Sequence, residues 1–431
     1  MSQQGATRDR IWSVDEHIED ILGALTPLEP LELNILDAQG CVLVDDVPVS
    51  TPLPPFDNSS MDGYAVRTAD TEGASWQFPA VLEVVGDIAA GTAETVRVAP
   101  GQCVRIMTGA PVPPGAEAVA PVEWTDGGTG SGPVNGMPAY RAAPEGAAGE
   151  LRIFRQVPQG AHIRRRGSDA SPGEPALAAG TVLGPPQIAL LAAIGRSTVR
   201  VRPRPRVVVI STGSELVQPG QTPGPGQIND SNSFALTAAA RDAGAVAFRV
   251  GAVPDDPDTL LDTISDQLVR ADLIVTSGGV SVGAYDVVKE VFAELGTVDF
   301  RRLAMQPGKP QGFGRIGPDG TPLCALPGNP VSAYVSFELF VRPAIRALMG
   351  VSPVRRPVVT ARLAGEVASS PEGKRQFLRA RYRPEQAEVT LVGGAGSHLV
   401  AALARANALL VVPEKTTSLD AGAEVQVIPL D

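Results

Sequence analysis

The sequence predicts an α/β multidomain protein, in which a central, doubly wound and mainly parallel α/β domain is combined with two small β domains and a helical and extended N-terminal region. Three observations predict this fold class. Residues 206–350 alternate strand and helix patterns, which is typical of crossovers between parallel strands. Residues 77–155 and those after 350 alternate apolar and polar positions between Gly and Pro turns. The length of 431 residues exceeds what one hydrophobic core normally organises.

The N-terminal region begins with a well-marked helix. Ser13 and Glu16 fit a capping box, because each side chain can bond the free backbone N–H of the other. An apolar face follows, and the helix is expected to end before Pro27. The later features expected before the α/β domain are an extended proline-rich segment (47–55), a polar segment (57–65), an exposed hairpin tip (127–136) and a second helix (186–194).

The α/β domain begins after Arg202–Pro205, where the pattern changes. Each strand is a short apolar run and each helix has one apolar face. We expect Pro343 to kink the final helix. The expected strands are 207–210, 246–253, 273–275 and 298–303, and the expected helices are 232–242, 258–269, 286–295 and 331–349.

Composition excludes several classes of function. The chain has 47 acidic and 36 basic residues and a formal charge of −11, which disfavours nonspecific binding to nucleic acid. Cys41, Cys103 and Cys324 are odd in number and lack C-x-x-C spacing, so neither a disulfide framework nor a zinc site is expected. No apolar run has the length of a signal-peptide core or a membrane span, so we expect a cytoplasmic protein that does not contact a membrane.

The most informative stretch is 272–286, where a buried strand runs into a glycine-rich loop that ends in a carboxylate. Gly278 and Gly279 allow backbone N–H groups to approach an anion, so the loop predicts a site for phosphate or another oxyanion. Such a loop can also be only a tight turn between strand and helix. A third interpretation is a serine hydrolase with Ser281 as nucleophile and His398 as base, but this serine lies several residues past the strand, unlike a nucleophile elbow.

Polar motifs recur just after several predicted strands, and the carboxyl ends of parallel strands meet at one edge of a sheet. Carboxylates there offer the hard oxygen ligands that Mg²⁺ prefers, although each is equally typical of a helix cap. Lys309, on a turn after a strand, can meet a phosphate or a small oxyanion. The carboxylates in question are Glu215, Asp286 and one of Asp255 and Asp256.

Together these motifs resemble the MoeA family, the molybdopterin molybdotransferases, which includes the catalytic domain of gephyrin and its plant counterpart. The similarity covers essentially the whole chain. The motifs that carry it stand in family order and are Asp57–Ala65, Arg105–Pro111, Arg164–Gly167, Ser211–Glu215, Ser277–Gly283, Pro307–Pro310 and Pro327–Ser332.

The resemblance implies a molecule of four parts. It also implies a homodimer, in which the active site combines the α/β domain of one subunit with the first and last regions of its partner. The four parts are an elongated N-terminal region (1–55 with 156–203), an inserted β domain (56–155), a molybdopterin-binding α/β domain (204–350) and a C-terminal β domain (351–431).

The implied reaction inserts molybdenum from molybdate into adenylylated molybdopterin. The dithiolene sulfurs take up molybdenum, Mg²⁺ supports cleavage of the pyrophosphate bond, and AMP and the molybdenum cofactor leave. The residues that the resemblance implicates are Asp62, Thr108, Glu215 and Asp286 in catalysis, Glu215, Asp256 and Asp286 at the metal, Gly278, Gly279 and Ser281 at the pterin phosphate, and Arg302, Lys309, Pro310, Ser332, Arg379 and Ser397 at molybdate.

One departure from the family pattern concerns molybdate. Gln306 stands where members often carry a lysine ahead of Pro-Gly, and Arg302 stands where a second lysine is common. We therefore expect binding to depend more on Arg302 and Lys309. Two other functions stay open: a molybdopterin adenylyltransferase, whose resemblance is limited to residues 206–350, and a gephyrin-like non-catalytic scaffold, although this chain lacks an extra fused module and a long linker.

Overall fold

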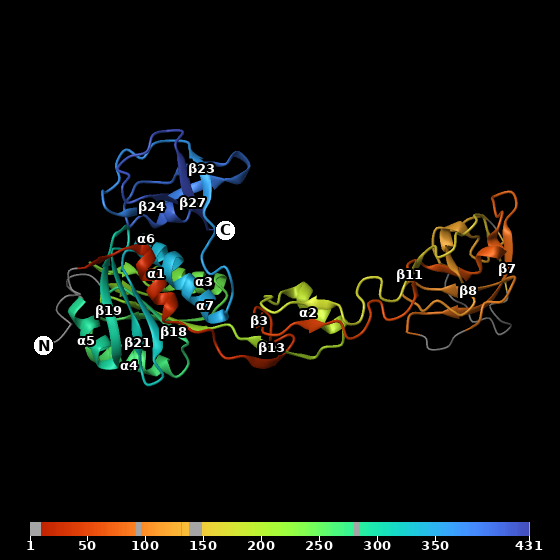
Figure 1. The fold of residues 1–431 in the computed structure, drawn as a ribbon, viewed down its shortest axis with the longest axis horizontal. Coiled ribbons are helices and arrows are strands. Elements are labelled where there is room, and N and C mark those ends of the chain that lie inside the picture. The colour runs from red at the N-terminus through yellow and green to blue at the C-terminus, as the bar shows by residue number, and fades with distance from the viewer. Residues whose placement is uncertain (1–9, 92–95, 131, 138–148, 280–284, 431) are drawn as a thin grey trace. The chain divides into compact units, whose positions relative to one another are not determined.

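The computed structural model describes residues 10–91, 96–130, 132–137, 149–279 and 285–430 (Figure 1). The chain divides into two compact units. The first unit comprises residues 1–45, 179–184 and 198–431, and the second comprises residues 46–178 and 185–197. In the described part of the chain, no helix has both the length and the apolar character needed to span a membrane.

A seven-stranded sheet forms the centre of the first unit (Figure 1). Its order is β1-β19-β21-β22-β18-β14-β17, and the four strands β14, β17, β18 and β22 are parallel neighbours. Strand β21 is antiparallel to β19 and β22. The strands are β1 (Ile11–Trp12), β14 (Arg206–Thr212), β17 (Val246–Val253), β18 (Leu273–Ser277), β19 (Gly296–Leu303), β21 (Pro310–Ile316) and β22 (Thr321–Leu326).

Helices cover both faces of this sheet. We use the name α/β region for residues 206–349, which supply most of the sheet and most of these helices. Alternate strand residues enter two different cores, as the period of two in a strand requires: Val207 and Val209 of β14 pack on one side, Val208 and Ile210 on the other. The first face is covered by α1 (Val14–Gly23), α3 (Asn232–Asp242), α6 (Pro330–Ser336), the π-helical segment η4 (Phe337–Val341) and α7 (Arg342–Met349), and the second by α4 (Pro257–Leu268) and α5 (Tyr285–Leu295).

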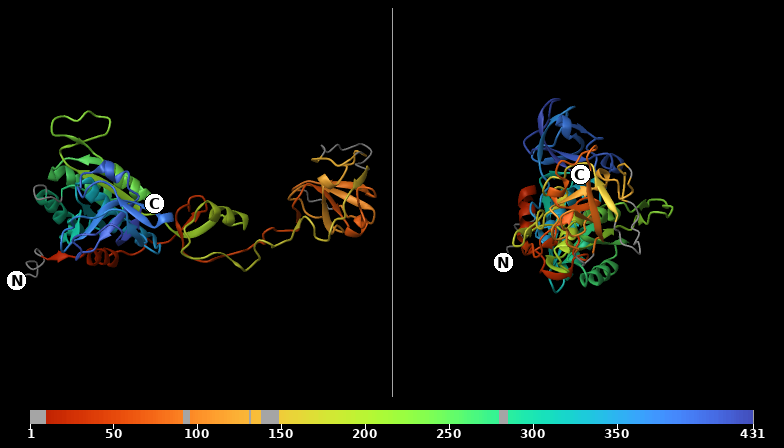
Figure 2. Two further views of the ribbon diagram at one scale, coloured as in Figure 1. Left: turned by 90° about the horizontal axis from the view of Figure 1, so that it is seen from above. Right: turned by 90° about the vertical axis from the view of Figure 1, so that its right-hand side faces the viewer.

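Two short strands, β15 (Leu216–Val217) and β16 (Ile228–Asn229), pair outside the main sheet. The proline- and glycine-rich segment between them projects from the α/β region, as the view from above in Figure 2 shows.

A separate three-stranded sheet in the first unit has the order β2-β13-β3 and consists of β2 (Leu31–Asn34), β13 (Thr198–Arg202) and β3 (Val42–Leu43).

The C-terminal β region (residues 359–430) is a ring of strands around its own apolar core. Each of five strands pairs with the next, and β24 also pairs with β26, which closes the ring. Strand β20 (Met305–Gln306) comes from the α/β region and adds to β24, so the ring is tied to that region by backbone pairing. The other elements are β23 (Val359–Leu363), β24 (Arg375–Arg383), the 3-10 helix η5 (Pro384–Gln386), β25 (Glu388–Leu391), α8 (Val400–Leu403), β26 (Ala408–Val412) and β27 (Glu424–Pro429).

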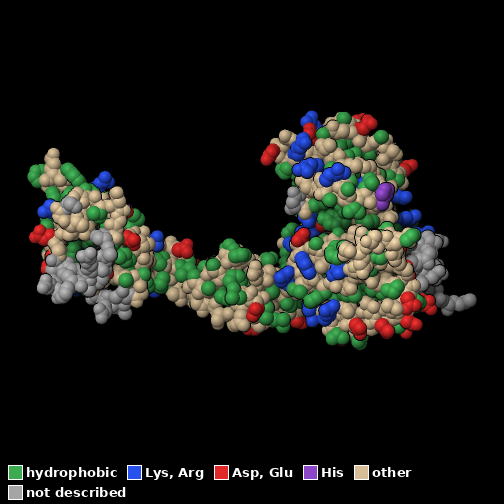
Figure 3. All heavy atoms as spheres, turned by 180° about the vertical axis from the view of Figure 1, so that it is seen from behind, with side chains coloured by type: hydrophobic (Ala, Val, Ile, Leu, Met, Phe, Trp, Pro, Cys, Tyr) green, Lys and Arg blue, Asp and Glu red, His purple; other side chains and the backbone are tan. Residues whose placement is uncertain are grey.

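Charge is unevenly distributed over the first unit. On the face that Figure 3 shows, Lys and Arg side chains gather on the C-terminal β region and on the adjoining part of the α/β region. Acidic side chains gather along the lower edge of the α/β region in the same view.

The second unit is built mainly from a five-stranded sheet with the order β10-β7-β8-β6-β9. Two short antiparallel ladders, β4 with β12 and β5 with β11, connect its outgoing and returning chain segments. The elements are β4 (Val47–Pro48), β5 (Asn58–Ser59), β6 (Gly63–Val66), η2 (Thr68–Thr71), β7 (Ala80–Ile88), β8 (Gln102–Ile106), β9 (Ala118–Pro121), η3 (Val122–Trp124), β10 (Glu150–Ile153), β11 (Ile163–Arg164), β12 (Pro175–Leu177) and α2 (Pro185–Ala193).

The predicted fold class is confirmed, and most expected elements lie within one or two residues of their predicted bounds. At α1 the capping box is present: Ser13 Oγ accepts from the Glu16 N–H at 3.0 Å, and the Ser13 N–H donates to Glu16 Oε2 at 2.8 Å. The prediction of one final helix kinked at Pro343 was wrong in detail, because a π-helical segment interrupts it before that proline. The antiparallel hairpin of β21 and β22 was not predicted.

Candidate functional site

A cavity of about 1080 Å³ opens at the carboxyl edge of the seven-stranded sheet. It lies where β14, β18 and β22 end, which is where open α/β sheets bind ligands. The C-terminal β region contributes a further side of the cavity through residues 395–398 and Lys374. The cavity therefore brings together segments from both parts of the first unit.

The glycine-rich loop follows β18 directly and lines this cavity. Gly278 and Gly279 have φ values of 103° and 68°, which favour glycine. A Cβ at Gly278 would lie 2.3 Å from the Thr212 carbonyl oxygen, and one at Gly279 would lie 2.1 Å from Val288 Cγ2. Beside them Thr212 Oγ1 is buried and has no partner in the described part of the chain. Thr212 and Val288 therefore pack so closely on this loop that both positions require glycine.

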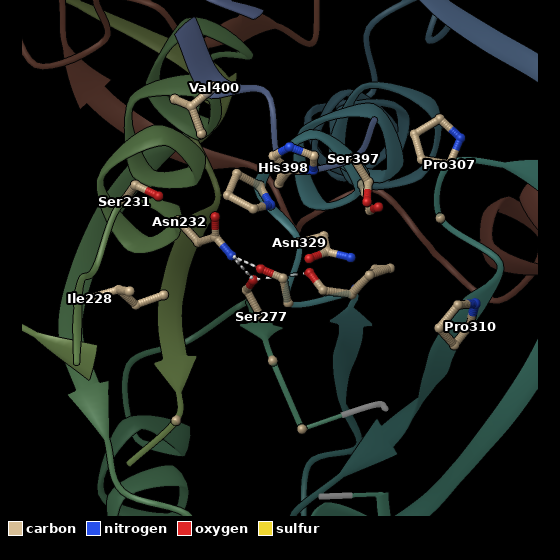
Figure 4. A pocket seen from close by; sticks show the side chains of 18 of the residues that line it. Ile228, Ser231, Asn232, Ser277, Pro307, Pro310, Asn329, Ser397, His398 and Val400 are labelled. Carbon is tan, nitrogen blue, oxygen red and sulfur yellow. Dashed lines mark hydrogen bonds between the residues drawn. The ribbon is translucent and has the colours of Figure 1, made fainter. Parts of the chain in front are cut away.

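A hydrogen-bond network holds three loops of the cavity together (Figure 4). The Asn232 side chain, at the start of α3, donates to Ser277 Oγ at 2.8 Å and to the Gly328 carbonyl at 2.7 Å. The Ser277 hydroxyl donates in turn to the Pro327 carbonyl at 3.3 Å. The ends of β18 and β22 are thereby fixed relative to α3.

Carboxylates line one part of the cavity. Glu215 and Asp255 both lie in its wall, and the Asp255 N–H donates to Ser214 Oγ at 3.1 Å, which joins their two loops. Asp230, also in the wall, is buried and accepts a hydrogen bond from the Ser233 N–H at 3.0 Å. This arrangement provides hard oxygen ligands at the strand ends.

Asp256 does not line the cavity but caps α4. Its carboxylate accepts from the Thr259 N–H at 2.9 Å and from Thr259 Oγ1 at 2.6 Å. These bonds, first the one from the hydroxyl, lower the pKa of Asp256. Of the two neighbouring aspartates, Asp255 is thus the one placed to meet a ligand.

The carboxylates suit Mg²⁺ better than a metal that needs a full protein cage. Among the described residues, no group of three or more His, Cys, Asp or Glu side chains is arranged to hold a metal ion. Mg²⁺ commonly takes one or two carboxylates, several waters and phosphate oxygens from the substrate. Glu215 and Asp255 fit that requirement without further protein ligands.

Cations and hydroxyls line another part of the cavity. Lys309 and Pro310 lie there, after β20, together with the hydroxyl-bearing Ser332 of α6. Ser397 and His398 reach the cavity from the C-terminal β region (Figure 4). The Val331 N–H donates to the Ser397 carbonyl at 3.0 Å, which holds that segment against the start of α6.

Two predicted anion-binding arginines are placed differently. Arg302 is exposed on β19 and does not line the cavity, so the expectation that it compensates for Gln306 is not supported by its position. Arg379, only 3 % exposed, lies behind the wall: it donates to the Gly394 carbonyl, and its Nε has no partner in the described chain. Burial lowers its pKa. Arg379 therefore supports the loop that carries Ser397.

Asp62 and Thr108 belong to the second unit and bond to each other. Asp62 Oδ1 accepts from the Thr108 N–H at 2.7 Å and from Thr108 Oγ1 at 2.8 Å. These bonds, the backbone one first, lower the pKa of Asp62. Nearby in the sequence motif, Asp57 binds the Arg165 side chain at 2.7 Å and the Arg166 N–H at 2.7 Å.

Two predicted residues fall outside what the structure describes. Ser281 lies among the residues that are not described. Asp286 belongs to α5, but its side chain is likewise outside the described atoms.

Sequence reasoning missed several residues of the cavity wall, among them Asp230, Asn232 and Lys374. Asn232 was expected only as the first residue of a helix, and Lys374 was not singled out at all. The scarcity of lysine in this chain is a signal that could have identified Lys374.

Family models match nearly all of the chain. They are the MoeA N-terminal region (domain I and II) over residues 12–195, a probable molybdopterin binding domain over 208–347, and the MoeA C-terminal region (domain IV) over 360–430.

Individual relatives agree. A protein named molybdopterin molybdenumtransferase 2 from Mycobacterium tuberculosis is 45% identical over 421 residues, which covers 96% of this chain and 98% of the relative. The molybdopterin molybdenumtransferase of Bacillus subtilis is 33% identical over 390 residues, with 90% and 86% covered.

Solved structures resemble the whole chain as well. Two crystal structures of the molybdopterin biosynthesis MoeA protein from Pyrococcus horikoshii align with TM-scores of 0.72 and 0.70, at 31% and 26% identity, over 98% and 97% of this chain and all of theirs. By sequence motifs, family models and fold, this chain belongs to the MoeA family.

Proposed function

We propose that this protein is a molybdopterin molybdenumtransferase, which inserts molybdenum from molybdate into adenylylated molybdopterin and releases AMP in molybdenum cofactor biosynthesis. One observation carries the proposal: a single cavity at the carboxyl edge of the sheet combines Gly278 and Gly279, which we call the glycine cradle, with carboxylates and lysines. These groups match, in turn, a phosphate, a metal-bound pyrophosphate and a small oxyanion. Mg²⁺ dependence and a cytoplasmic location are further parts of the proposal.

The glycine cradle would hold the pterin phosphate. Gly278 and Gly279 line the cavity without side chains of their own, so a phosphate oxygen can approach their backbone N–H groups. The free hydroxyl of Thr212 offers a further donor at the same place. Ser281, in the same loop, is assigned a hydrogen-bonding role here and not that of a nucleophile.

The carboxylates would orient the pyrophosphate. Glu215 and Asp255, which line the cavity, would hold Mg²⁺ together with Asp286, and the metal would neutralise charge on the pyrophosphate. These carboxylates would also keep molybdate out of this part of the cavity, because a carboxylate without a bound cation repels another anion. Asp256 is left with the cap of α4.

The lysine and hydroxyl groups would hold molybdate. Molybdate is a tetrahedral dianion, so an ammonium together with hydroxyl and backbone donors forms a suitable pocket. Lys309, Pro310, Ser332 and Ser397 line this part of the cavity, and Arg379 keeps the Ser397 loop in place. Molybdate would thus be held apart from the carboxylates until the dithiolene sulfurs reach it.

We further propose a homodimer, in which Asp62 and Thr108 of one subunit complete the active site of the other. Their mutual hydrogen bonds present Asp62 as an ionised carboxylate with a second oxygen, Oδ2, that these two bonds leave unused. Mixing an Asp62→Asn subunit with an Asp286→Asn subunit tests this. Activity regained in the mixture supports a shared site, and no recovery after verified subunit exchange contradicts it.

The function is tested by incubating the protein with adenylylated molybdopterin, molybdate and Mg²⁺. We expect AMP, measured by chromatography, together with a product that activates a molybdenum enzyme lacking its cofactor. The Asp286→Asn variant should release little AMP. Unchanged AMP release by that variant would remove Asp286 from the metal and pyrophosphate site.

The alternative functions make different predictions. A molybdopterin adenylyltransferase would form the adenylylated pterin from molybdopterin and ATP, and a scaffold would do neither reaction. Neither is favoured, because the similarity extends over the whole chain to proteins named molybdenumtransferases. A serine hydrolase would be labelled by a fluorophosphonate probe, with labelling lost in Ser281→Ala.

A further inference from the structure

Lysine is rare in this chain, which makes its positions informative. Of the 36 basic residues only four are lysines, at positions 289, 309, 374 and 415, and the others are arginines. Lys309 and Lys374 both line the cavity at the carboxyl edge of the sheet. Half of the lysines in the chain therefore line one cavity.

Among the residues that the structure describes, arginines make the ion pairs with carboxylates and these two lysines make none. Throughout the described residues, each ion pair with a carboxylate is formed by an arginine, as between Arg375 and Asp15 at 2.8 Å or Arg206 and Asp272 at 2.8 Å. Lys309 and Lys374 have no carboxylate within 4.0 Å in that part of the chain. Two uncompensated cations in one cavity attract an anion.

Backbone pairing explains why Lys374 reaches the cavity. Strands β20 and β24 are parallel, with Met305 opposite Arg375, and the Arg375 N–H donates to the Ala304 carbonyl at 2.9 Å. The Arg375 side chain turns to Asp15 and Glu414. Lys374 is the bend residue directly before β24, so this pairing holds it beside the start of β20, and Lys374 lines the same cavity as residues 305–310.

We propose that Lys374 is a molybdate-binding residue, which supplies the second ammonium beside Lys309. The proposal rests on the proposed function for the identity of the anion. Gln306, the cavity residue three positions before Lys309, is neutral and cannot balance a dianion. A second positive charge must come from another segment, and Lys374 is the described cation that lines the cavity from the C-terminal β region.

The first test measures AMP release as a function of molybdate concentration. We expect Lys374→Ala to raise the molybdate concentration for half-maximal rate about tenfold, since a charged hydrogen bond to the ion is lost. The rate at saturating molybdate should stay within about twofold of the wild type. Lys374→Arg should restore part of the affinity, because it keeps the charge but changes its geometry. Lys374→Gln serves if the alanine variant is unstable.

Lys415→Ala is the matched control, because this lysine is exposed on the same region and does not line the cavity. It should leave the molybdate requirement unchanged. An unchanged requirement in both Lys374→Ala and Lys374→Gln would overturn the proposal, as would a lower saturating rate with unchanged half-saturation.

A second test separates this proposal from the proposed function. Sodium molybdate alone is titrated calorimetrically into the wild type and the two lysine variants, with no pterin present. Weaker binding in Lys374→Ala than in Lys415→Ala supports Lys374 as an anion-binding residue even if no AMP is ever released. Equal binding in the two variants overturns the proposal, while AMP release by the wild type would still support the proposed function.

Discussion

The Asn232 side chain donates to the Ser277 hydroxyl at 2.8 Å and so joins the first turn of α3 to the last residue of β18. The same amide also reaches the Gly328 carbonyl at 2.7 Å. One side chain therefore positions the loops after β18 and β22, both of which line the cavity. The glycine cradle is held in place by a residue that does not belong to it.

Replacing Asn232 should loosen this edge of the sheet. We expect Asn232→Ala to lower the free energy of unfolding by about 1–2 kcal/mol, since one part-buried and one exposed hydrogen bond are lost. The kcat/KM for AMP release should fall about tenfold, because the loops lose their fixed position. Denaturant unfolding and steady-state kinetics measure the two effects. The exposed Asn34, changed to Ala, should alter neither, and a fully active Asn232→Ala protein would contradict the positioning role.

A side chain at Gly278 should be poorly tolerated. In Gly278→Ala the Cβ would lie 2.3 Å from the Thr212 carbonyl oxygen, and the residue would keep a φ of 103°. Gly422→Ala is the matched control, with a φ of 88° and nothing within 4 Å of the added atom. The control should lose only about 1 kcal/mol, the usual cost of a positive φ. Equal thermal stability of the two variants would argue against the close approach.

Neighbouring carboxylates should separate into metal-site and structural roles. We expect Asp255→Asn and Glu215→Gln to lower AMP release and to raise the Mg²⁺ concentration needed for activity. Asp256→Asn should mainly lower thermal stability, because Asp256 caps α4 through Thr259. Activity measured against Mg²⁺ concentration distinguishes the two classes. A raised Mg²⁺ requirement in Asp256→Asn alone would reverse the assignment.

His17 should make stability depend on pH. It is a residue of α1 and is 1 % exposed, and burial, followed by the charge of Arg301, lowers its pKa from 6.5 to about 3. Between these two pH values the unfolded chain binds a proton at His17 that the folded protein does not bind. The contribution of neutral His17 to the free energy of unfolding is therefore complete above pH 6.5 and is lost as the pH falls toward 3. Relative to His17→Gln, the wild type should lose roughly 1.4 kcal/mol per pH unit between pH 6.5 and 5.

Denaturant unfolding at several pH values measures this difference. His398→Gln is the control, because His398 is exposed. If wild type and His17→Gln lose stability in parallel, the buried histidine does not cause the dependence.

Asp62 should contribute to stability only while it is ionised. The Thr108 N–H, and then the Thr108 hydroxyl, lower its pKa below the ordinary 3.8. The contribution is therefore present above pH 3.8 and lost as the pH falls through the lower value of the folded state. It should be small, because the carboxylate is exposed and screened by solvent. Unfolding curves of wild type and Asp62→Asn should differ near neutrality and converge in acid.

Much of the fold could be predicted because its signals are local. The capping box of Ser13 and Glu16, and the short apolar runs such as 207–210, specify a helix start and a buried strand within a few residues. The long final helix was predicted only in part, because the π-helical turn at 337–341 arises from packing and leaves no local signal. The β21–β22 hairpin was missed because β22 is buried along its whole length and lacks alternation.

The candidate site was predictable where the chain itself forms it. Gly278, Gly279 and Lys309 were identified from local motifs that follow predicted strands, and all three line the cavity. Asp255 and Asp256 could not be told apart, since either can cap a helix. Only the bonds from Thr259 identify which of the two is the cap.

The sequence by itself determined the fold class, the family and the glycine cradle, because short-range patterns and motif order carry that information. Only the tertiary structure shows that Asn232 bonds to Ser277, that Arg302 does not line the cavity, and that Lys374 and Lys309 line the same cavity. The physical reason is that these neighbours are far apart in the chain. Their contacts depend on strand pairing, such as β20 with β24, and on the direction in which each strand presents its side chains.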